Sequence, residues 1–294
     1  MPPAESIEQI RRLTSPLTSR PTGEAPRIEP LAGIRAVLFD VYGTLVISGC
    51  GDIGLTAPRA EHDQFRRAVG AAGIGIDALP DDFNGTRALV EAIAESHANA
   101  REQGVDYPEV DILAIWETVL EGLGIRTDAE TLRRVVIEYE FRSNPVWPMP
   151  GLDQLLDALT RRDLVLGIVS NAQFYTPLML AAFLGSDIGT IGFDQRCCAW
   201  SYQHRVGKPS VRVFEPALAA LARDYAIEPQ EVLYIGNDLR NDIWPAKQLG
   251  CRTALFAGDA RSLRLREDDP SLRDVHPDRV VTALEQITTH LLAG

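Results

Sequence analysis

Ala36-Val37-Leu38-Phe39-Asp40-Val41-Tyr42-Gly43-Thr44-Leu45 is the stretch of sequence that decides the fold. Four apolar residues lead into a carboxylate and then into a Gly-Thr pair, a pattern that predicts a buried strand ending in a loop. Ligands of open α/β sheets bind at the carboxyl ends of the strands. Asp40 is therefore a candidate nucleophile or metal ligand.

Strand-like and helix-like segments alternate from residue 147 onwards. This alternation is typical of an open parallel sheet wrapped by helices on both faces, so we expect an α/β fold with a Rossmann-like core. Apolar runs predict strands over 164–169, 191–193, 232–235 and 253–256. Apolar residues at three- and four-residue spacing predict helices over 152–162, 176–184, 213–225, 243–249 and 280–292.

A block of helical patterns interrupts this alternation soon after the first strand. We expect helices over 62–71, 86–102, 110–123 and 129–141, and a Gly-rich loop over 48–54 before them. Residues 1–33 are predicted to form an arm that begins with a short amphipathic helix. The expected parts are an N-terminal extension over 1–33, an α/β core over 34–55 and 147–294, and a helical cap over 56–146 that covers the carboxyl ends of the strands.

The composition narrows the class of protein and of partner. A net charge of −12 disfavours non-specific binding to nucleic acid or to an anionic membrane, although a locally positive site still suits a small anionic substrate. The four cysteines match no CxxC metal pattern, so we expect reduced thiols. No apolar run predicts a transmembrane helix and the N-terminal residues do not resemble a signal peptide. We expect a cytoplasmic protein, either monomeric or oligomeric.

Polar residues follow three of the predicted strands, and a fourth loop contributes a lysine. A parallel sheet brings such strand ends to one crevice, where carboxylates, amides and a lysine suit chemistry on an anion. Carboxylate oxygens in the same crevice are ligands that Mg²⁺ prefers. The residues are Asp40 and Thr44 after the first strand, Ser170-Asn171, Lys208, and Asn237-Asp238 with Asp242.

Together these segments resemble the four motifs of the haloacid dehalogenase (HAD) superfamily of hydrolases. Each motif alone has an ordinary structural interpretation, such as a strand end, a surface lysine or a helix-entry acid. Their order over residues 34–258 carries the resemblance, and the helical block is similar to the superfamily's α-helical cap. The matching segments are Asp40-Val41-Tyr42-Gly43-Thr44, Ser170-Asn171, Lys208-Pro209, and Gly236-Asn237-Asp238-Leu239-Arg240-Asn241-Asp242.

The resemblance implies a role for each matched residue. Asp40 would be the nucleophile that forms a covalent aspartyl intermediate, and water would hydrolyse that intermediate. Thr44, Ser170 and Lys208 would complete the catalytic set, while Tyr42 and Asn171 would contact the substrate. Mg²⁺ would be held by Asp40, the backbone carbonyl of Tyr42, Asn237, Asp238 and Asp242.

Tyr42 departs from the pattern of the superfamily's phosphatases. They usually carry an aspartate there that protonates the leaving group, and a phenol with a reference pKa near 10 is a poor substitute at neutral pH. Tyrosine at this position is what 2-haloacid dehalogenases show, and those enzymes work without metal. The fourth motif instead favours a metal-dependent enzyme, because its acids are closer to those of the superfamily's metal-binding members.

Three functions follow from this conflict. The leading hypothesis is Mg²⁺-dependent hydrolysis of a small phosphorylated metabolite, with a preference for good leaving groups such as aryl or acyl phosphates. The second is a metal-independent 2-haloacid dehalogenase, which needs a cation from the cap to receive its substrate. The third is a non-catalytic protein that binds a phosphorylated ligand or a protein partner. The candidate cap cations are Arg66, Arg67, Arg87, Arg101 and Arg142.

Overall fold

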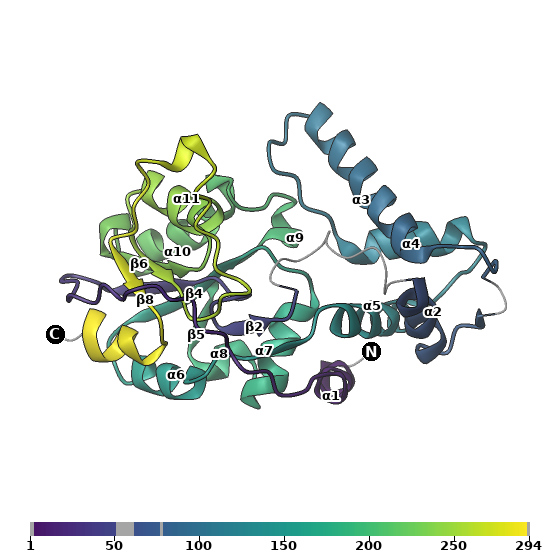
Figure 1. Cartoon of the computed structure of the whole chain (residues 1–294), viewed down its shortest axis with the longest axis horizontal. Coiled ribbons are helices and arrows are strands. Elements are labelled where there is room, and N and C mark those ends of the chain that lie inside the picture. Colours follow the sequence, from purple (N-terminus) through teal and green to yellow (C-terminus); the bar gives the residue numbers. More distant parts are fainter. Residues whose placement is uncertain (1–2, 51–61, 77–78, 293–294) are drawn as a thin grey trace.

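A six-stranded sheet lies at the centre of the molecule (Figure 1). The computed structural model describes residues 3–50, 62–76 and 79–292. The sheet has the order β5-β4-β1-β6-β7-β8, and every neighbouring pair of strands is parallel, which confirms the predicted α/β fold. The strands are β1 (Ala36–Phe39), β4 (Val165–Ser170), β5 (Phe193–Trp200), β6 (Val232–Gly236), β7 (Arg252–Phe256) and β8 (Arg279–Val281).

The strand β1 is short but central, and its four residues are all fully buried. Phe39 pairs with Ile168 of β4 on one side and with Ile235 of β6 on the other. Strands that are buried on both faces are expected to be continuously apolar, as this one is. The register places Asp40, the next residue, between the carboxyl ends of β4 and β6.

Helices cover both faces of the sheet (Figure 1). Val37 and Phe39 belong to one apolar cluster, whereas Ala36 and Leu38 belong to a second cluster on the opposite face, as alternation along a strand requires. The helices of the core are α6 (Leu152–Thr160), α7 (Tyr175–Leu184), α8 (Ile188–Ile191), α9 (Ser201–His204), α10 (Glu215–Tyr225) and α11 (Trp244–Gln248). Short helical turns are η2 (Val211–Val213), η3 (Pro229–Glu231), η4 (Leu239–Ile243), η5 (Pro270–Leu272) and η6 (Ile287–Leu291).

Four helices form an insert between two short antiparallel strands, β2 (Val46–Ser48) and β3 (Val146–Pro148). Figure 1 shows this helical insert grouped to one side of the sheet. Its core is aromatic: Trp116 is fully buried and stacks on Phe65 with ring centroids 4.8 Å apart. The helices are α2 (His62–Ala71), α3 (Gly85–Glu102), α4 (Ile112–Gly122) and α5 (Ala129–Ser143), close to their predicted bounds.

The N-terminal arm links the insert to the core. Its predicted helix is present as α1 (Pro3–Leu13), which packs against both α5 and α7. Gln9 Nε2 donates a hydrogen bond to Glu138 on α5 (2.9 Å), and Arg11 Nε donates to the Ala182 carbonyl on α7 (3.0 Å). The arm then runs along the sheet edge, where Arg27 forms a β-bridge with Val280.

Two sequence predictions are wrong in detail. The helix expected over 280–292 is present only over 285–291, because Val280 and Val281 pair with β7 and complete the sheet edge. The strand expected over 191–193 instead begins at Phe193 and runs through polar residues to Trp200, because an edge strand can expose one face. The part of the predicted Gly-rich loop from residue 51 lies outside the described residues.

Candidate active site

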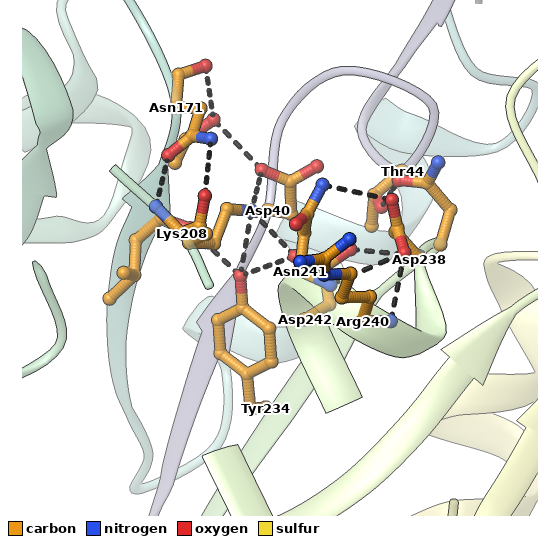
Figure 2. Close-up of polar contacts among 12 residues, drawn as sticks. Asp40, Thr44, Asn171, Lys208, Tyr234, Asp238, Arg240, Asn241 and Asp242 are labelled. Carbon is orange, nitrogen blue, oxygen red and sulfur yellow. Dashed lines mark hydrogen bonds and ion pairs between the residues drawn. The ribbon is translucent and has the colours of Figure 1, made fainter. Parts of the chain in front are cut away.

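Asp40 is held by two neighbours at the carboxyl end of the sheet (Figure 2). Its Oδ1 accepts hydrogen bonds from Ser170 Oγ (2.8 Å) and Lys208 Nζ (2.6 Å). No group among the described residues donates to its Oδ2. The side chain is nevertheless almost buried, so one carboxylate oxygen is fixed and the other is available to a substrate.

Lys208 joins Asp40 to a second buried carboxylate. Its Nζ lies 2.6 Å from Asp40 Oδ1 and 2.5 Å from Asp242 Oδ1. Burial acts to lower the pKa of Lys208, but the charges of Asp242 and Asp40 outweigh it and raise the pKa. The lysine is therefore charged at neutral pH and can neutralise an anion bound at Asp40.

Asp242 lies in a crowded, acid-rich environment. Its Oδ2 accepts a hydrogen bond from the backbone N–H of Asp238 (2.9 Å). Burial raises the pKa of Asp242 to about 6; Lys208 opposes this shift, and the charge of Asp40 adds to it. The carboxylates at this edge of the sheet are thus incompletely neutralised by the lysine that they share.

Asn171 and Tyr234 fix the lysine from two sides. Asn171 accepts a hydrogen bond from the Lys208 backbone N–H (2.7 Å) and donates to the Lys208 carbonyl (3.2 Å). The hydroxyl of Tyr234 accepts from Lys208 Nζ (3.2 Å), and its proton is shared between the Val169 carbonyl and Asp242. Figure 2 shows Asn171 at the main chain of Lys208 and the Tyr234 hydroxyl at its ammonium. The amide of Asn171, predicted to contact substrate, is engaged with the lysine loop.

Thr44 and Asn237 hold the loop that follows β1. Thr44 Oγ1 donates to Asn237 Oδ1 (3.1 Å), and Asn237 Nδ2 donates to the Ser262 carbonyl (2.6 Å). Gly43, which directly precedes Thr44, has a φ of +81°. A Cβ at this position would lie 2.5 Å from Ser262 Cβ. Only glycine fits this turn without strain, which explains the Gly-Thr pair after the nucleophile candidate.

The carboxylate of Asp238 is occupied by an arginine and by neighbouring groups of its own loop. Its carboxylate pairs with Arg266 in a bidentate manner, at 2.5 Å and 3.1 Å, and also accepts from the side chain of Asn241 (2.9 Å). It further caps the helical turn η4 by accepting from the N–H of Arg240 (2.9 Å). A bidentate arginine leaves a carboxylate little capacity for another cation.

Tyr42 faces the same site as a neutral phenol. Its hydroxyl is hydrogen-bonded to Thr176 Oγ1 (2.9 Å). Burial, followed by the charge of Glu140, raises the pKa of Tyr42 above its ordinary value of 10.0. At neutral pH this side chain neither releases a proton readily nor accepts one.

A cavity of about 830 Å³ joins the core residues to the helical insert. Asp40, Tyr42 and Lys208 line its core side, and residues of α3, α4 and α5 line the other. Of the five arginines considered as cap cations, Arg87 and Arg101 line the cavity. Arg87 is paired with Glu91 at 2.7 Å.

The oxygen donors around Asp40 fit Mg²⁺, but with fewer carboxylates than the resemblance implies. In the described ranges, no three His, Cys, Asp or Glu side chains gather as a metal site. Asp40, Asp242 and the amide oxygen of Asn237 remain as donors once Asp238 is paired with Arg266. Ser262 Oγ, in the cavity wall beside Asn237, is buried and has no hydrogen-bond partner in the described part of the chain. Such a donor set, with amide and water oxygens supplementing carboxylates, suits a hard cation.

Four residues of the site were missed by the sequence analysis: Thr176, Tyr234, Ser262 and Arg266. Tyr234 stands two residues before Gly236, inside a strand where an aromatic residue is ordinarily core. Arg266 and Ser262 come from a segment after β7 that carries no motif. Their contacts with Asp238 and Asn237 depend on the tertiary fold, so no local signal indicates them.

Comparisons with known proteins identify the family and the fold. A family model for haloacid dehalogenase-like hydrolases matches residues 34–250, and the curated proteins gave no match. Among solved structures, the chain is similar to a 2-haloacid dehalogenase from Pseudomonas syringae pv. Tomato DC3000, with 19% identity and a TM-score of 0.55, over 87% of this chain and 97% of that one. It is also similar to a HAD phosphatase from Thermococcus onnurineus, with 18% identity and a TM-score of 0.49 over the same shares of the two chains. At 19% identity, the likeness to the Pseudomonas structure bears on the fold alone.

Proposed function

The chain belongs to the haloacid dehalogenase-like hydrolases, and from this premise we propose that Asp40 is the covalent nucleophile of a Mg²⁺-dependent phosphohydrolase. The observation that carries the proposal is the asymmetry of Asp40, whose Oδ1 is fixed by Ser170 and Lys208 while Oδ2 receives no hydrogen bond from the described residues. A carboxylate oriented in this way presents one oxygen to a bound electrophile. In this proposal the helical insert acts as the cap over the core.

The reaction proceeds in two displacements on phosphorus. Asp40 Oδ2 forms a bond to the phosphorus of a phosphate ester as the bond to the leaving oxygen breaks. Lys208 and the Ser170 hydroxyl stabilise the negative charge that develops on the transferring group. Water then attacks the phosphorus of the aspartyl phosphate, the bond to Oδ2 breaks, and inorganic phosphate leaves.

The metal site of the proposal is built from Asp40, the Tyr42 carbonyl, Asn237 and Asp242. Bound there, Mg²⁺ would supply positive charge beside the phosphate oxygens. Asp238 instead shapes the loop through its ion pair with Arg266. Asn171 and Thr44 keep Lys208 and the loop after β1 in place.

The side chain at position 42 determines which leaving groups can depart. Because its neutral phenol is a weak acid, it does not protonate the departing oxygen. Esters whose alcohol leaves readily without a proton, such as aryl phosphates, or acyl phosphates, are therefore the expected substrates.

A 2-haloacid dehalogenase is the second candidate, and Tyr42 is the observation that favours it. Halide leaves without a proton, so an enzyme that attacks carbon needs neither a general acid nor a metal. In that reaction Asp40 Oδ2 would displace halide from carbon, and water would hydrolyse the resulting ester. Membership of a hydrolase family disfavours the third alternative, a non-catalytic binding protein.

One parallel assay separates the two reactions. Purified protein is given 4-nitrophenyl phosphate or 2-chloropropionate, each with Mg²⁺ or with EDTA, and Asp40→Asn serves as the control. We expect release of 4-nitrophenol that stops with EDTA and with Asp40→Asn. Chloride release that is unaffected by EDTA would establish the dehalogenase instead. Phosphatase activity that persists in EDTA would contradict the dependence on Mg²⁺.

A further inference from the structure

The insert side of the cavity exposes apolar surface. Val90 on α3 lines the cavity and is 38% exposed, and Ile93, one helical turn further on, lines it too. Among the described residues only Val90 and Ile76 are exposed large hydrophobic residues. Ile76 lies outside the cavity lining. An apolar side chain left exposed inside a pocket indicates a ligand with apolar surface.

Aromatic surface adjoins this apolar patch. The ring of Tyr139 lines the cavity and packs edge-on against Trp116, with centroids 5.2 Å apart. Its hydroxyl is hydrogen-bonded to Thr86 Oγ1 (3.0 Å), which fixes the ring. A fixed aromatic ring prefers another ring in an offset or edge-to-face arrangement.

The charged groups on this side are of both signs: Glu109 and Glu140 line the cavity, and so do Arg87 and Arg101. Glu140 on α5 faces the cavity, and its carboxylate makes no ion pair within the described residues. Glu109 also faces it and is held by Ser201 (2.8 Å) and by the N–H of Val110 (2.9 Å). Arg87 is neutralised by Glu91. A substrate that carried another carboxylate or phosphate beside Glu109 or Glu140 would meet an acidic group.

The size of the cavity also favours a substrate with a bulky leaving group. Ligand pockets of roughly 300–1,000 Å³ hold molecules of drug size, and this cavity is about 830 Å³. A phosphate group at Asp40 fills only the core side. Because the attacking and leaving oxygens of phosphoryl transfer lie in line, the leaving group points away from Asp40 and into the cavity.

From these observations we propose that Val90, Ile93 and Tyr139 form a wall that binds an uncharged, bulky aromatic leaving group. The substrates are then phosphate monoesters of polycyclic or substituted phenols. The inference rests on the proposed phosphohydrolase function and extends it, because it assigns selectivity to named residues of the insert.

The test compares two esters that differ mainly in ring size, phenyl phosphate and 2-naphthyl phosphate. The wild-type protein should prefer 2-naphthyl phosphate by about tenfold or more in kcat/KM, mainly through KM, since each apolar group bound in a fitting pocket contributes at least about that factor. Val90→Asp should remove most of this preference by raising KM for the larger ester. Ile76→Asp, which adds the same charge at the exposed apolar residue outside the cavity, should leave the preference unchanged.

Equal kcat/KM for the two esters in the wild-type protein, or equal effects of Val90→Asp and Ile76→Asp, would overturn the inference. So would faster turnover of phosphoglycolate, which carries no aromatic ring. If neither aryl ester is hydrolysed, the phosphohydrolase proposal fails, and the wall is then tested separately by binding of 2-naphthol. Weaker binding to Val90→Asp than to Ile76→Asp supports the wall, and equal binding contradicts it.

Discussion

The core side and the insert side of the cavity differ in the residues that line them. On the core side, Asp40, Lys208 and Asp242 are almost buried, and Lys208 makes short polar contacts with both carboxylates. On the insert side, exposed Val90 and Tyr139 line the same cavity, and they add apolar and aromatic surface to it. From this comparison we propose that the core side determines which bond is broken, whereas the insert side determines which molecules enter the cavity.

Removing the nucleophile should have the largest effect, and only on the core side. Asp40→Asn is expected to lower kcat by at least about 10⁴-fold, because the amide cannot form the covalent intermediate. Binding of 2-naphthol on the insert side should be unchanged, as measured by titration calorimetry. A variant that retained more than about one per cent of kcat would show that the core side works without this residue.

Lys208→Met should affect both chemistry and stability. We expect a loss of about 10²–10³-fold in kcat, because charge on the transferring group is no longer neutralised. The free energy of unfolding should fall by about 3 kcal/mol, since two buried carboxylates lose their shared partner. Urea denaturation of the wild-type protein and the variant measures this change in the free energy of unfolding.

The matched control for that variant is Lys247→Met. Lys247 pairs with Asp278 at 3.3 Å, and its side chain is 35% exposed. An exposed pair of this kind contributes at most about 1 kcal/mol. Equal destabilisation by the two substitutions would contradict the contrast between a dense core side and the rest of the surface.

Tyr42→Phe distinguishes a structural phenol from a proton donor. It removes only the hydrogen bond to Thr176, so the free energy of unfolding should fall by about 1 kcal/mol. The value of kcat with 4-nitrophenyl phosphate should stay within about threefold, because the neutral phenol takes no part in proton transfer. A large loss of kcat would mean that the core side contains an acid after all.

The smallest effect concerns His97 on the insert side. Burial, followed by the charge of Arg101, lowers the pKa of His97 below its ordinary value of 6.5. The unfolded chain therefore binds this proton more readily, and stability decreases as the pH falls through 6.5. Solvent screening keeps the effect below about 1 kcal/mol.

Urea denaturation at about pH 7.5 and about pH 5.5 checks this, with His97→Gln for comparison. The wild-type protein should lose slightly more stability at the lower pH than the variant does. An identical loss in both proteins would exclude a contribution from His97.

The same contrast explains what could be predicted from the sequence. Asp40, Ser170 and Asp242 follow strands, and the topology of a parallel sheet is enough to bring strand ends together. The four helices of the insert were also predicted closely, because their apolar spacing is regular. The helix expected over 280–292 was wrong at its start, because the pairing of Val280 and Val281 with β7 overrides local spacing.

Contacts made by isolated side chains could not be predicted. Arg266 reaches Asp238 from a segment without a motif, and Val90 differs from the other apolar residues of α3 only in what the fold leaves uncovered. Exposure and pairing of this kind arise from tertiary packing, which sequence periodicity does not specify. The selectivity of the cavity is therefore harder to predict than its chemistry.

A rapid-quench experiment tests the central claim, that Asp40 carries the covalent intermediate. Protein is mixed with excess 4-nitrophenyl phosphate and Mg²⁺, quenched in acid during turnover, digested and analysed by mass spectrometry. The account predicts one phosphoryl group on the peptide that contains Asp40, and none on that peptide in Asp40→Asn. Turnover with no modified peptide, or with the phosphoryl group on another residue such as Asp242, would contradict it.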